Sequence, residues 1–315
     1  MENRIAPKAS KDSFYYKSGL YLYRKYAALS IMLLPVIIYY IVFHYAPMYG
    51  VIIAFKNYSF SRGIIGSPWA GLANFKRMFA SASFFEVFRN TLLISFYKLI
   101  TGFPAPVVFA ILLNELKNAK FKKTVQTISY LPHFLSWVIL GGMFIQLLAL
   151  SGPVNIMLSK LGISPVYFLG DVKYFRSVLV VTSLWKSIGW GSIIYLAALT
   201  GIDPQLYEAA KIDGAGKLKQ ILHVTLPALV PVITIMFIFS VGSIINDDFD
   251  QIFNLYNEAV YSVGDVISTY NYRIGLLNSE YSYSTAVGLF KNIISVVLIV
   301  STNFIAKKYN DYGIW

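Results

Sequence analysis

Residues 226–245, LPALVPVITIMFIFSVGSII, decide the fold class of this chain. None of these side chains is charged, and the run is long enough to cross a bilayer, because about 20 apolar helical residues span a hydrocarbon core of about 30 Å. Pro231 lies inside the run. A proline is tolerated in a membrane helix when neighbouring groups satisfy the freed carbonyl. The stretch is therefore predicted to be a membrane-spanning helix.

Similar apolar runs lie on both sides of this stretch. The chain of 315 residues is 57% hydrophobic and only 13% charged, whereas a soluble globular chain carries about 25% charged residues. The sequence predicts an all-α polytopic membrane protein with six transmembrane helices, at about 27–51, 90–113, 127–150, 174–200, 226–245 and 284–306.

The predicted spans divide the chain into one membrane domain and two tails. Residues 1–26 form a basic tail that is too long, before too long an apolar run, to be a cleavable signal. The membrane domain covers 27–306, with its core at about 89–306 and a connecting loop at 201–225. Residues 307–315 form a second short tail.

Lysine and arginine gather in alternate connections. They occupy the N-terminal tail, the connections after the second and fourth spans and the C-terminal tail, and the positive-inside rule therefore places both termini in the cytoplasm. The connection after the fifth span is acidic, and its carboxylates are expected to be solvated. The connection after the first span is less regular; a short helix on the membrane surface is expected there. Its basic residues are Lys56, Arg62, Lys76, Arg77 and Arg89.

The net charge of +12 is explained by these basic connections. Nucleic-acid binding is not expected, because no basic face is interleaved with exposed aromatic residues. The chain has no cysteine and three scattered histidines, so neither disulfides nor a four-ligand metal site is predicted.

The most informative connection follows the fourth span. Asp203 suits a helix N-cap and Pro204 the first helical position, while Gly214 and Gly216 are natural stops. They predict a short surface helix of about ten residues. Leu206, Ala209 and Ala210 share one face of it, and the two alanines make that face shallow. Pro227 is expected to begin the fifth span.

The spacing of this connection resembles the EAA motif of binding-protein-dependent ABC importer permeases. The matching residues are Glu208, Ala209, Ala210, Gly214, Val224, Leu226 and Pro227, with Asp213 and Ala215 in the common Asp-Gly-Ala core. Val224 stands where isoleucine is usual, and Leu218 and Ile221 stand where aromatic residues are frequent. The resemblance implies the type I importer permease fold and a coupling helix, in which Glu208, Ala209, Ala210, Asp213 and Gly214 form the joint with an ATPase subunit.

The resemblance extends over about residues 27–315 and indicates a branch of the family. YAPMYGVIIAFKNY at 45–58, WAGLANF at 69–75, GFPAPVVFAILLNE at 102–115 and YLPHFLSWV at 130–138 look like the LplB-like oligosaccharide permeases of the maltose-type family. This implies a multi-pass protein of the bacterial plasma membrane, forming a heterodimer with a second homologous permease. The other implied partners are two copies of a cytoplasmic ATPase subunit, an extracellular solute-binding lipoprotein and an oligosaccharide.

The chain itself is not expected to hydrolyse ATP. A phosphate-binding loop needs a glycine separated by four residues from Gly-Lys, and a hydroxyl residue after the lysine. Around Gly216 and Lys217 these places hold Lys211 and Leu218. No cofactor is therefore predicted in this chain, and ATP and Mg²⁺ are assigned to the partner ATPase subunits.

The substrate path is predicted from polar and aromatic residues inside spans, because such residues are costly in lipid and usually face a cavity or a partner. The candidates are His133, Ser136, Trp137, Gln146, Lys186 and Trp190, with Lys98, Asn246 and Asn292 as further polar positions. Trp137 near His133 and Gln146 is the first choice for stacking on a sugar. Helix–helix hydrogen bonding is the alternative for each. Lys186 suits a backbone carbonyl or a partner carboxylate better than a neutral sugar. If the substrate is an acidic oligosaccharide, Lys186 and Lys98 become stronger candidates for binding it.

Two other classes of protein explain the sequence less well, although a secondary transporter would explain the spans. An ion-coupled secondary sugar transporter would show coupling carboxylates deep in the spans and would leave the capped Glu-Ala-Ala helix unexplained. A membrane enzyme would need paired carboxylates or a Ser/His/Asp set at one face, and the acidic connection after the fifth span contains no histidine.

Overall fold

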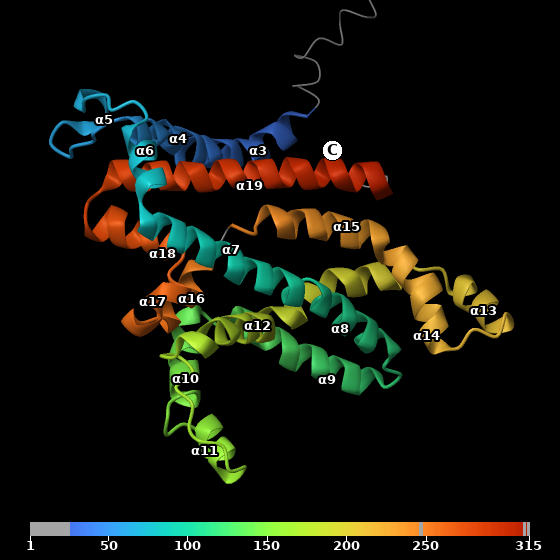
Figure 1. Cartoon of the computed structure of the whole chain (residues 1–315). Helices are drawn as coiled ribbons and strands as arrows, with labels where there is room; N and C mark the ends of the chain where they lie inside the picture. The colour runs from blue at the N-terminus through green and yellow to red at the C-terminus, as the bar shows by residue number, and fades with distance from the viewer. Residues whose placement is uncertain (1–25, 246–247, 311–312, 314–315) are drawn as a thin grey trace, which may run out of the picture.

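The structure is a computed structural model of the chain and describes residues 26–245, 248–310 and 313. Within them the architecture is helical, and the single β-bridge described joins Lys56 and Trp69. The long helices α7, α8, α12, α15 and α19 extend between two ends of the molecule (Figure 1). Helix α13 lies at one end, and α5 and α17 lie at the other. This all-α fold confirms the predicted fold class.

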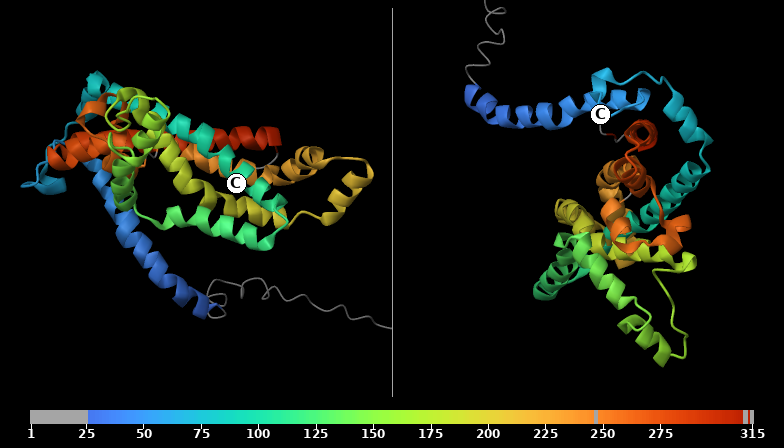
Figure 2. Two further views of the ribbon diagram at one scale, coloured as in Figure 1. Left: turned by 90° about the horizontal axis from the view of Figure 1, so that it is seen from below. Right: turned by 90° about the vertical axis from the view of Figure 1, so that its left-hand side faces the viewer.

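The first predicted span is a long helix that changes its winding at a proline. The candidate span Leu29–Phe55 consists of α3 (Ala27–Tyr40), a π-helical turn (Ile41–Tyr45), α4 (Ala46–Met48) and a 3₁₀ segment (Tyr49–Phe55). Pro47 lies two residues after the end of the π-helical turn and has no amide hydrogen to donate. No residue in the most hydrophobic 18-residue stretch of this span is buried against the rest of the chain. Figure 2 shows α3 extending away from the other helices.

The connection after this span contains two short helices, α5 (Gly63–Gly66) and α6 (Ala73–Ala80). Its ordered loop is pinned by Lys56, a buried lysine whose Nζ donates to the carbonyls of Ile64 at 2.8 Å and Ile65 at 3.1 Å. The connection therefore contains short helices, as expected; their location on the membrane surface stays a prediction.

The second span is longer than predicted. Helices α7 (Ala82–Gly102) and α8 (Pro104–Glu115) join into one 34-residue candidate span, Ala82–Glu115. Pro104 is accommodated because it stands at the first position of α8, where a missing amide hydrogen costs least.

The third span is broken, not straight as 127–150 implied. Helix α9 (Ala119–Tyr130) and a 3₁₀ turn (Leu131–Phe134) meet α10 (Trp137–Leu147) at an angle of 104°. Pro132 lies in the turn, Leu135 has extended backbone, and the Ser136 hydroxyl caps α10 by accepting from the Ile139 amide. The chain has five helices long and apolar enough to cross a membrane in its described part, or six when this bent pair counts as one span.

The fourth and fifth spans flank the functional connection. Helix α11 (Pro153–Lys160) precedes α12 (Val172–Thr200), which is followed by α13 (Pro204–Ile212). Helix α14 (Lys217–Gln220), a π-helical turn (Ile221–Thr225) and α15 (Leu226–Gly242) then form one candidate span, Lys217–Gly242. Pro227 therefore lies within a continuous helix and does not begin it, because the wide π-helical turn precedes the missing donor.

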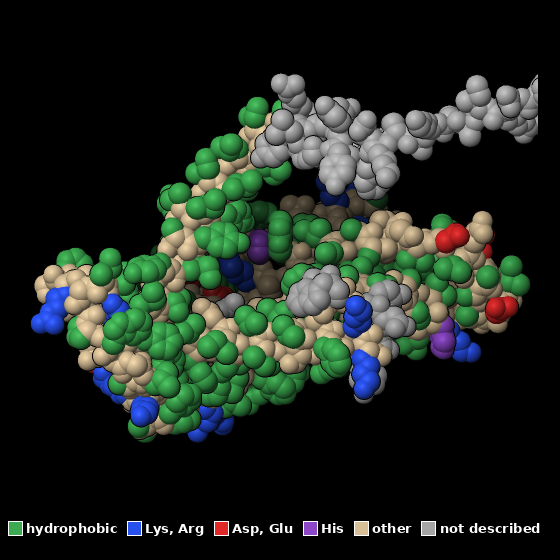
Figure 3. Space-filling model, turned by 90° about the horizontal axis from the view of Figure 1, so that it is seen from above, with side chains coloured by type: hydrophobic (Ala, Val, Ile, Leu, Met, Phe, Trp, Pro, Cys, Tyr) green, Lys and Arg blue, Asp and Glu red, His purple; other side chains and the backbone are tan. Residues whose placement is uncertain are grey.

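The remaining chain contains short elements and one long helix. These are α16 (Phe249–Leu255), a 3₁₀ turn (Glu258–Val260), α17 (Tyr261–Gly264), α18 (Ile267–Asn271), a π-helical turn (Tyr272–Leu277) and α19 (Tyr281–Asn310). Close packing of helix on helix is visible at Gly189, where an added Cβ would lie 2.2 Å from the Ser129 carbonyl oxygen. Hydrophobic side chains are widespread on the face shown in Figure 3, as expected for helices surrounded by lipid.

Candidate functional site

Helix α13 begins and ends as its sequence predicts. The Asp203 carboxylate accepts a hydrogen bond from the Gln205 amide at 2.9 Å, and Pro204 occupies the first helical position. At the other end Gly214 has a φ of 76°. The Gly214 amide donates to Lys211 O at 3.0 Å and the Ala215 amide to Ala210 O at 2.8 Å. These two bonds form a Schellman motif, which requires the left-handed conformation that glycine adopts without strain.

The same helix exposes an apolar surface at one end of the molecule. No residue of α13 is buried, and Glu208 and Ala209 are exposed. Leu206 is 52% exposed, Ile212 87% and Leu218 70%. Figure 1 shows α13 projecting beyond the ends of the long helices. We call residues 203–218 the coupling knob.

Polar contacts attach the coupling knob to α8 and to the span that contains α14 and α15. Tyr207 Oη lies 3.0 Å from Thr225 Oγ1, at the base of α15. Lys217 Nζ forms an ion pair with Glu115 Oε2, at the end of α8, at 2.7 Å. Gln220 Nε2 donates to the Ala215 carbonyl at 2.8 Å. The knob is thus joined to α8 and α15 through these contacts, and to α12 through the chain itself.

Lys186 fixes the break in the third span. Its Nζ, on α12, donates to the carbonyls of His133 at 3.2 Å and of Leu135, and more weakly to that of Pro132 at 3.4 Å. The Pro132 carbonyl also accepts from the Leu135 amide at 3.2 Å, whereas the described backbone bonds at the break leave the carbonyls of His133 and Leu135 to Lys186. Unpaired polar groups are costly within a membrane, so Lys186 satisfies these two carbonyls. Lys186 thus bonds to backbone carbonyls, one of the roles weighed for it.

Aromatic residues surround the break. The rings of His133 and Trp190 stack with centroids 4.4 Å apart and an interplanar angle of 2°. Lys186 Nζ lies 5.3 Å from the centre of the Trp137 ring. Trp137 is buried, and its Nε1 donates to Asp248 Oδ2 at 2.9 Å.

The fold brings together most of the predicted path residues. His133, Ser136, Trp137, Lys186 and Trp190 meet at the break. Gln146 does not join them: it is exposed near the far end of α10, about 13 Å along the helix axis from Trp137. Asn292 is exposed on α19, and Asn246 lies outside the described residues.

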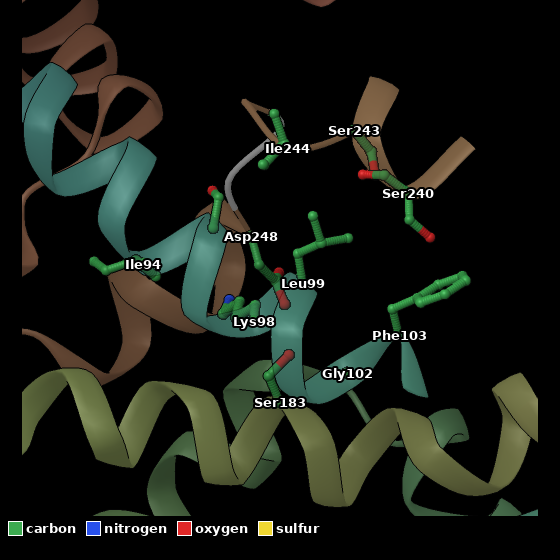
Figure 4. Close-up of a pocket in the computed structure, with 11 residues that line it drawn as sticks. Ile94, Lys98, Leu99, Gly102, Phe103, Ser183, Ser240, Ser243, Ile244 and Asp248 are labelled. Atoms are coloured by element: carbon green, nitrogen blue, oxygen red, sulfur yellow. The ribbon is translucent and has the colours of Figure 1, made fainter. Parts of the chain in front are cut away.

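A polar cavity between α7, α12 and α15 was not predicted from the sequence. Its volume is about 230 Å³, and its polar lining residues are Ser95, Lys98, Ser183, Ser240, Ser243 and Asp248. Figure 4 shows that Lys98, Ser183 and Ser240 come from three different helices around this space. Lys98 Nζ also donates to Gln251 Oε1, and Gln251 Nε2 donates to Leu179 O at 2.7 Å. Recurrent serines in otherwise apolar spans were the available signal, but serines also occur in ordinary helix packing.

Some carboxylates of the acidic connection are structural, contrary to the expectation that all are solvated. Asp265 is only 4% exposed, accepts from Thr269 Oγ1 at 2.8 Å and forms an ion pair with Arg273. Burial disfavours the Arg273 cation, but the hydrogen bond and charge of Asp265 outweigh it and raise the pKa of Arg273 above its ordinary value. Burial, with the neighbouring Tyr261, raises the pKa of Tyr256 to about 12. The carboxylates and histidines of the described residues form no cluster suited to a metal ion.

The chain is similar to known transport proteins over most of its length. A family model described as "Binding-protein-dependent transport system inner membrane component" matches residues 82–310. Protein LplB of Bacillus subtilis (strain 168) is 41% identical over 288 residues, which are 91% of each chain. The polygalacturonan/rhamnogalacturonan transport system permease protein YteP of the same organism is 42% identical over 91% of this chain and 90% of its own.

Solved structures agree with these relatives. A chain of a bacterial ABC transporter involved in the import of the acidic polysaccharide alginate superimposes with a TM-score of 0.85 and is 39% identical, over 91% of this chain and 98% of that chain. A chain of the bacterial alginate transporter in complex with an alginate pentasaccharide-bound periplasmic protein gives a TM-score of 0.86 at 38% identity, over 93% and 98%.

The relatives are transport permeases, and their likeness covers nearly the whole chain. Together with the long apolar helices, this identifies a multi-pass bacterial membrane protein with the ABC importer permease fold. The chain belongs to the family of inner membrane components of binding-protein-dependent transport systems.

Proposed function

We propose that this chain forms half of the translocation path of an ATP-driven importer for an oligosaccharide. A second homologous permease supplies the other half. Two ATPase subunits bind ATP and Mg²⁺ and supply the work, and an extracellular solute-binding lipoprotein delivers the sugar. The membrane domain corresponds to residues 27–306, with both tails in the cytoplasm. The polygalacturonan/rhamnogalacturonan permease and the alginate transporter support carbohydrate as the substrate class.

The coupling knob is the observation that carries this proposal. It exposes the large apolar side chains of Leu206, Ile212 and Leu218. Exposed apolar side chains gathered in one place usually mark a binding surface. Its backbone is fixed by a cap at Asp203 and a Schellman motif at Gly214. A rigid, apolar, exposed joint of this kind suits a partner that pushes on it. The mechanism of an ion-coupled transporter does not require such an exposed binding surface.

The polar cavity and the break in the third span support a substrate path. Serine hydroxyls suit sugar hydroxyls, and Lys98 and Lys186 place positive charge near the cavity and the break. His133 and Trp190 offer aromatic surface, with Trp190 still 44% exposed despite its stack. We assign His133, Ser136, Trp137, Lys186 and Trp190 to the walls of this path, with Gln146 set apart from them.

Blocking the cavity tests the path. The Ser240 hydroxyl donates to Met236 O of its own helix, at 2.8 Å, so Ser240→Trp fills the cavity without breaking a described contact between helices. Uptake of labelled oligosaccharide by the assembled transporter in vesicles is expected to fall about ten-fold or more, a barrier increase of at least about 1.4 kcal/mol. Ser240→Ala removes the hydroxyl but adds no bulk, so it should lower uptake much less than Ser240→Trp. Normal uptake through the tryptophan variant would remove this cavity from the path.

Dependence on an ATPase tests the function as a whole. An ATPase subunit is expected to co-purify with this chain, and uptake should stop when the catalytic residues of that ATPase are replaced. An ion-coupled carrier would instead keep working without the ATPase and lose uptake when the ion gradient is collapsed. Uptake that persists with an inactive ATPase would contradict the importer proposal.

A further inference from the structure

A second groove lies between α7 and α12, near the end of the molecule opposite the coupling knob. Its volume is about 490 Å³. Lys173, Ser177 and Val181 line it at helical spacing along α12, and Tyr97, Ile100 and Thr101 line it along α7. Both helices are candidate membrane spans, so the groove opens from the membrane domain and not from a connecting loop.

Positive charge gathers at one end of this groove. Lys173 and Arg176 lie in the first two turns of α12 and line the groove. Arg89 on α7 directly precedes Asn90, whose side chain accepts a hydrogen bond from Arg176. Arg176 donates to Asn90 Oδ1 at 2.8 Å and to Val263 O at 3.1 Å, which are both neutral acceptors.

These cations are not neutralised by carboxylates in the described part of the chain. The ion pairs found there join Arg77 to Glu280, Lys217 to Glu115 and Arg273 to Asp265. The acids nearest in sequence, Glu86 and Asp171, form none with the cluster, and the Asp171 carboxylate accepts from the Lys173 amide as the cap of α12.

The other end of the groove is apolar. Val180 and Val181 follow Arg176 by one turn or more on α12, and Ile100 faces them from α7. From Lys173 to Val181 the helix rises about 12 Å. The groove is thus amphiphilic along its length, with cations toward the end of the spans and aliphatic side chains toward their middle. Polar hydroxyl groups of a sugar would find few partners along the aliphatic part.

We propose that this groove binds one anionic phospholipid, with its phosphate between Arg89, Lys173 and Arg176 and an acyl chain along Ile100, Val180 and Val181. Basic pockets between membrane helices recognise lipid headgroups through such charge complementarity. The site is separate from the coupling knob and the serine-lined cavity, so it does not depend on the substrate of the transporter. The bound lipid would tie α7 to α12, the helices on either side of the broken third span.

Lipid retention by the assembled transporter tests this site. The transporter is reconstituted in phosphatidylcholine vesicles containing a minor fraction of phosphatidylglycerol and extracted in neutral detergent, and co-purifying lipid is quantified by mass spectrometry. Wild-type transporter is expected to retain phosphatidylglycerol well above its fraction in the vesicles. Arg89→Gln and Lys173→Gln should each weaken retention about five-fold. Arg176 is left unchanged because it also bonds to Asn90 and Val263.

Two further variants separate the headgroup from the acyl chain. Val181→Trp fills the apolar end, keeps all three cations and should also lower retention. Lys76→Gln removes an exposed cation outside the groove and should leave retention unchanged. Uptake by each variant confirms that it is folded and assembled.

Several results would overturn the proposal. Absence of phosphatidylglycerol enrichment in the wild type would mean that another occupant, such as the partner permease, covers the groove. If the Lys76 and Lys173 variants lost phosphatidylglycerol retention equally, the retention would be caused by general surface charge and not by the groove. Displacement of the lipid by glycerol 1-phosphate or by trigalacturonate would show that the cations bind a soluble anion and not a lipid headgroup.

Discussion

Replacing Gly214 with valine is expected to abolish uptake by the assembled transporter while the chain still inserts into the membrane. Gly214 has a φ of 76°, and no atom lies within 4 Å of the place where a Cβ would stand. The cost is therefore backbone strain and not a clash. A left-handed conformation costs a non-glycine residue about 1–2 kcal/mol, and a β-branched side chain is a pronounced outlier there.

This strain is expected to act on the joint and not on the fold. The Schellman bonds of the Gly214 and Ala215 amides close the end of α13, and relief of the strain would break them. The apolar surface formed with Ile212 and Leu218 would then change its shape. We expect uptake to fall at least about ten-fold, with ATP hydrolysis no longer stimulated by the loaded binding protein; uptake and hydrolysis are measured together in proteoliposomes.

Two controls make this prediction sharp. Gly214→Asn should retain much of the uptake, because asparagine adopts the left-handed conformation more readily than other residues. Gly216→Ala changes a glycine two residues away that has a φ of −66° and open space around it, so it should be nearly silent. Normal coupling in the valine variant would show that the knob does not transmit force through this turn.

Replacing Lys186 with methionine is expected to destabilise the assembled transporter. The substitution keeps the apolar stem but removes the donor for the carbonyls of Pro132, His133 and Leu135 at the 104° break. A buried acceptor left without a partner costs about 1–3 kcal/mol. A net loss of about 2 kcal/mol corresponds to a fall in melting temperature of roughly 5 °C, which thermal unfolding of the purified complex in detergent would measure.

The conservative variants distinguish a structural role from contact with substrate. Lys186→Gln retains two donors and should recover part of the lost stability. Ser187→Ala changes the next residue, whose hydroxyl bonds within α12 to Ser183 O at 2.8 Å, and should leave the melting temperature unchanged. If Lys186→Met unfolds like the wild type yet loses uptake only of acidic oligosaccharides, Lys186 binds substrate and does not hold the break.

The sequence alone predicted the class of fold and the coupling knob. Apolar run length is a local property, so the spans at 174–200 and 226–245 could be placed before any packing was known. The knob is local too, because Asp203 caps its start and Gly214 ends it within a single short helix. The broken third span was missed since Pro132 alone does not distinguish a kink within a helix from a turn between two helices.

Only the tertiary structure decided which polar groups meet inside the membrane domain. Trp137 and Asp248 are separated by 111 residues yet share a hydrogen bond, and the cavity takes Lys98, Ser183 and Ser240 from three helices. The sequence suggested that Trp137 would lie near Gln146, but the fold placed it against Lys186 and Asp248. The physical reason is that apolar length and end-capping are set by neighbours along the chain. Polar pairing across a bundle depends on how far each helix is rotated and tilted, which only the packing of all the helices determines.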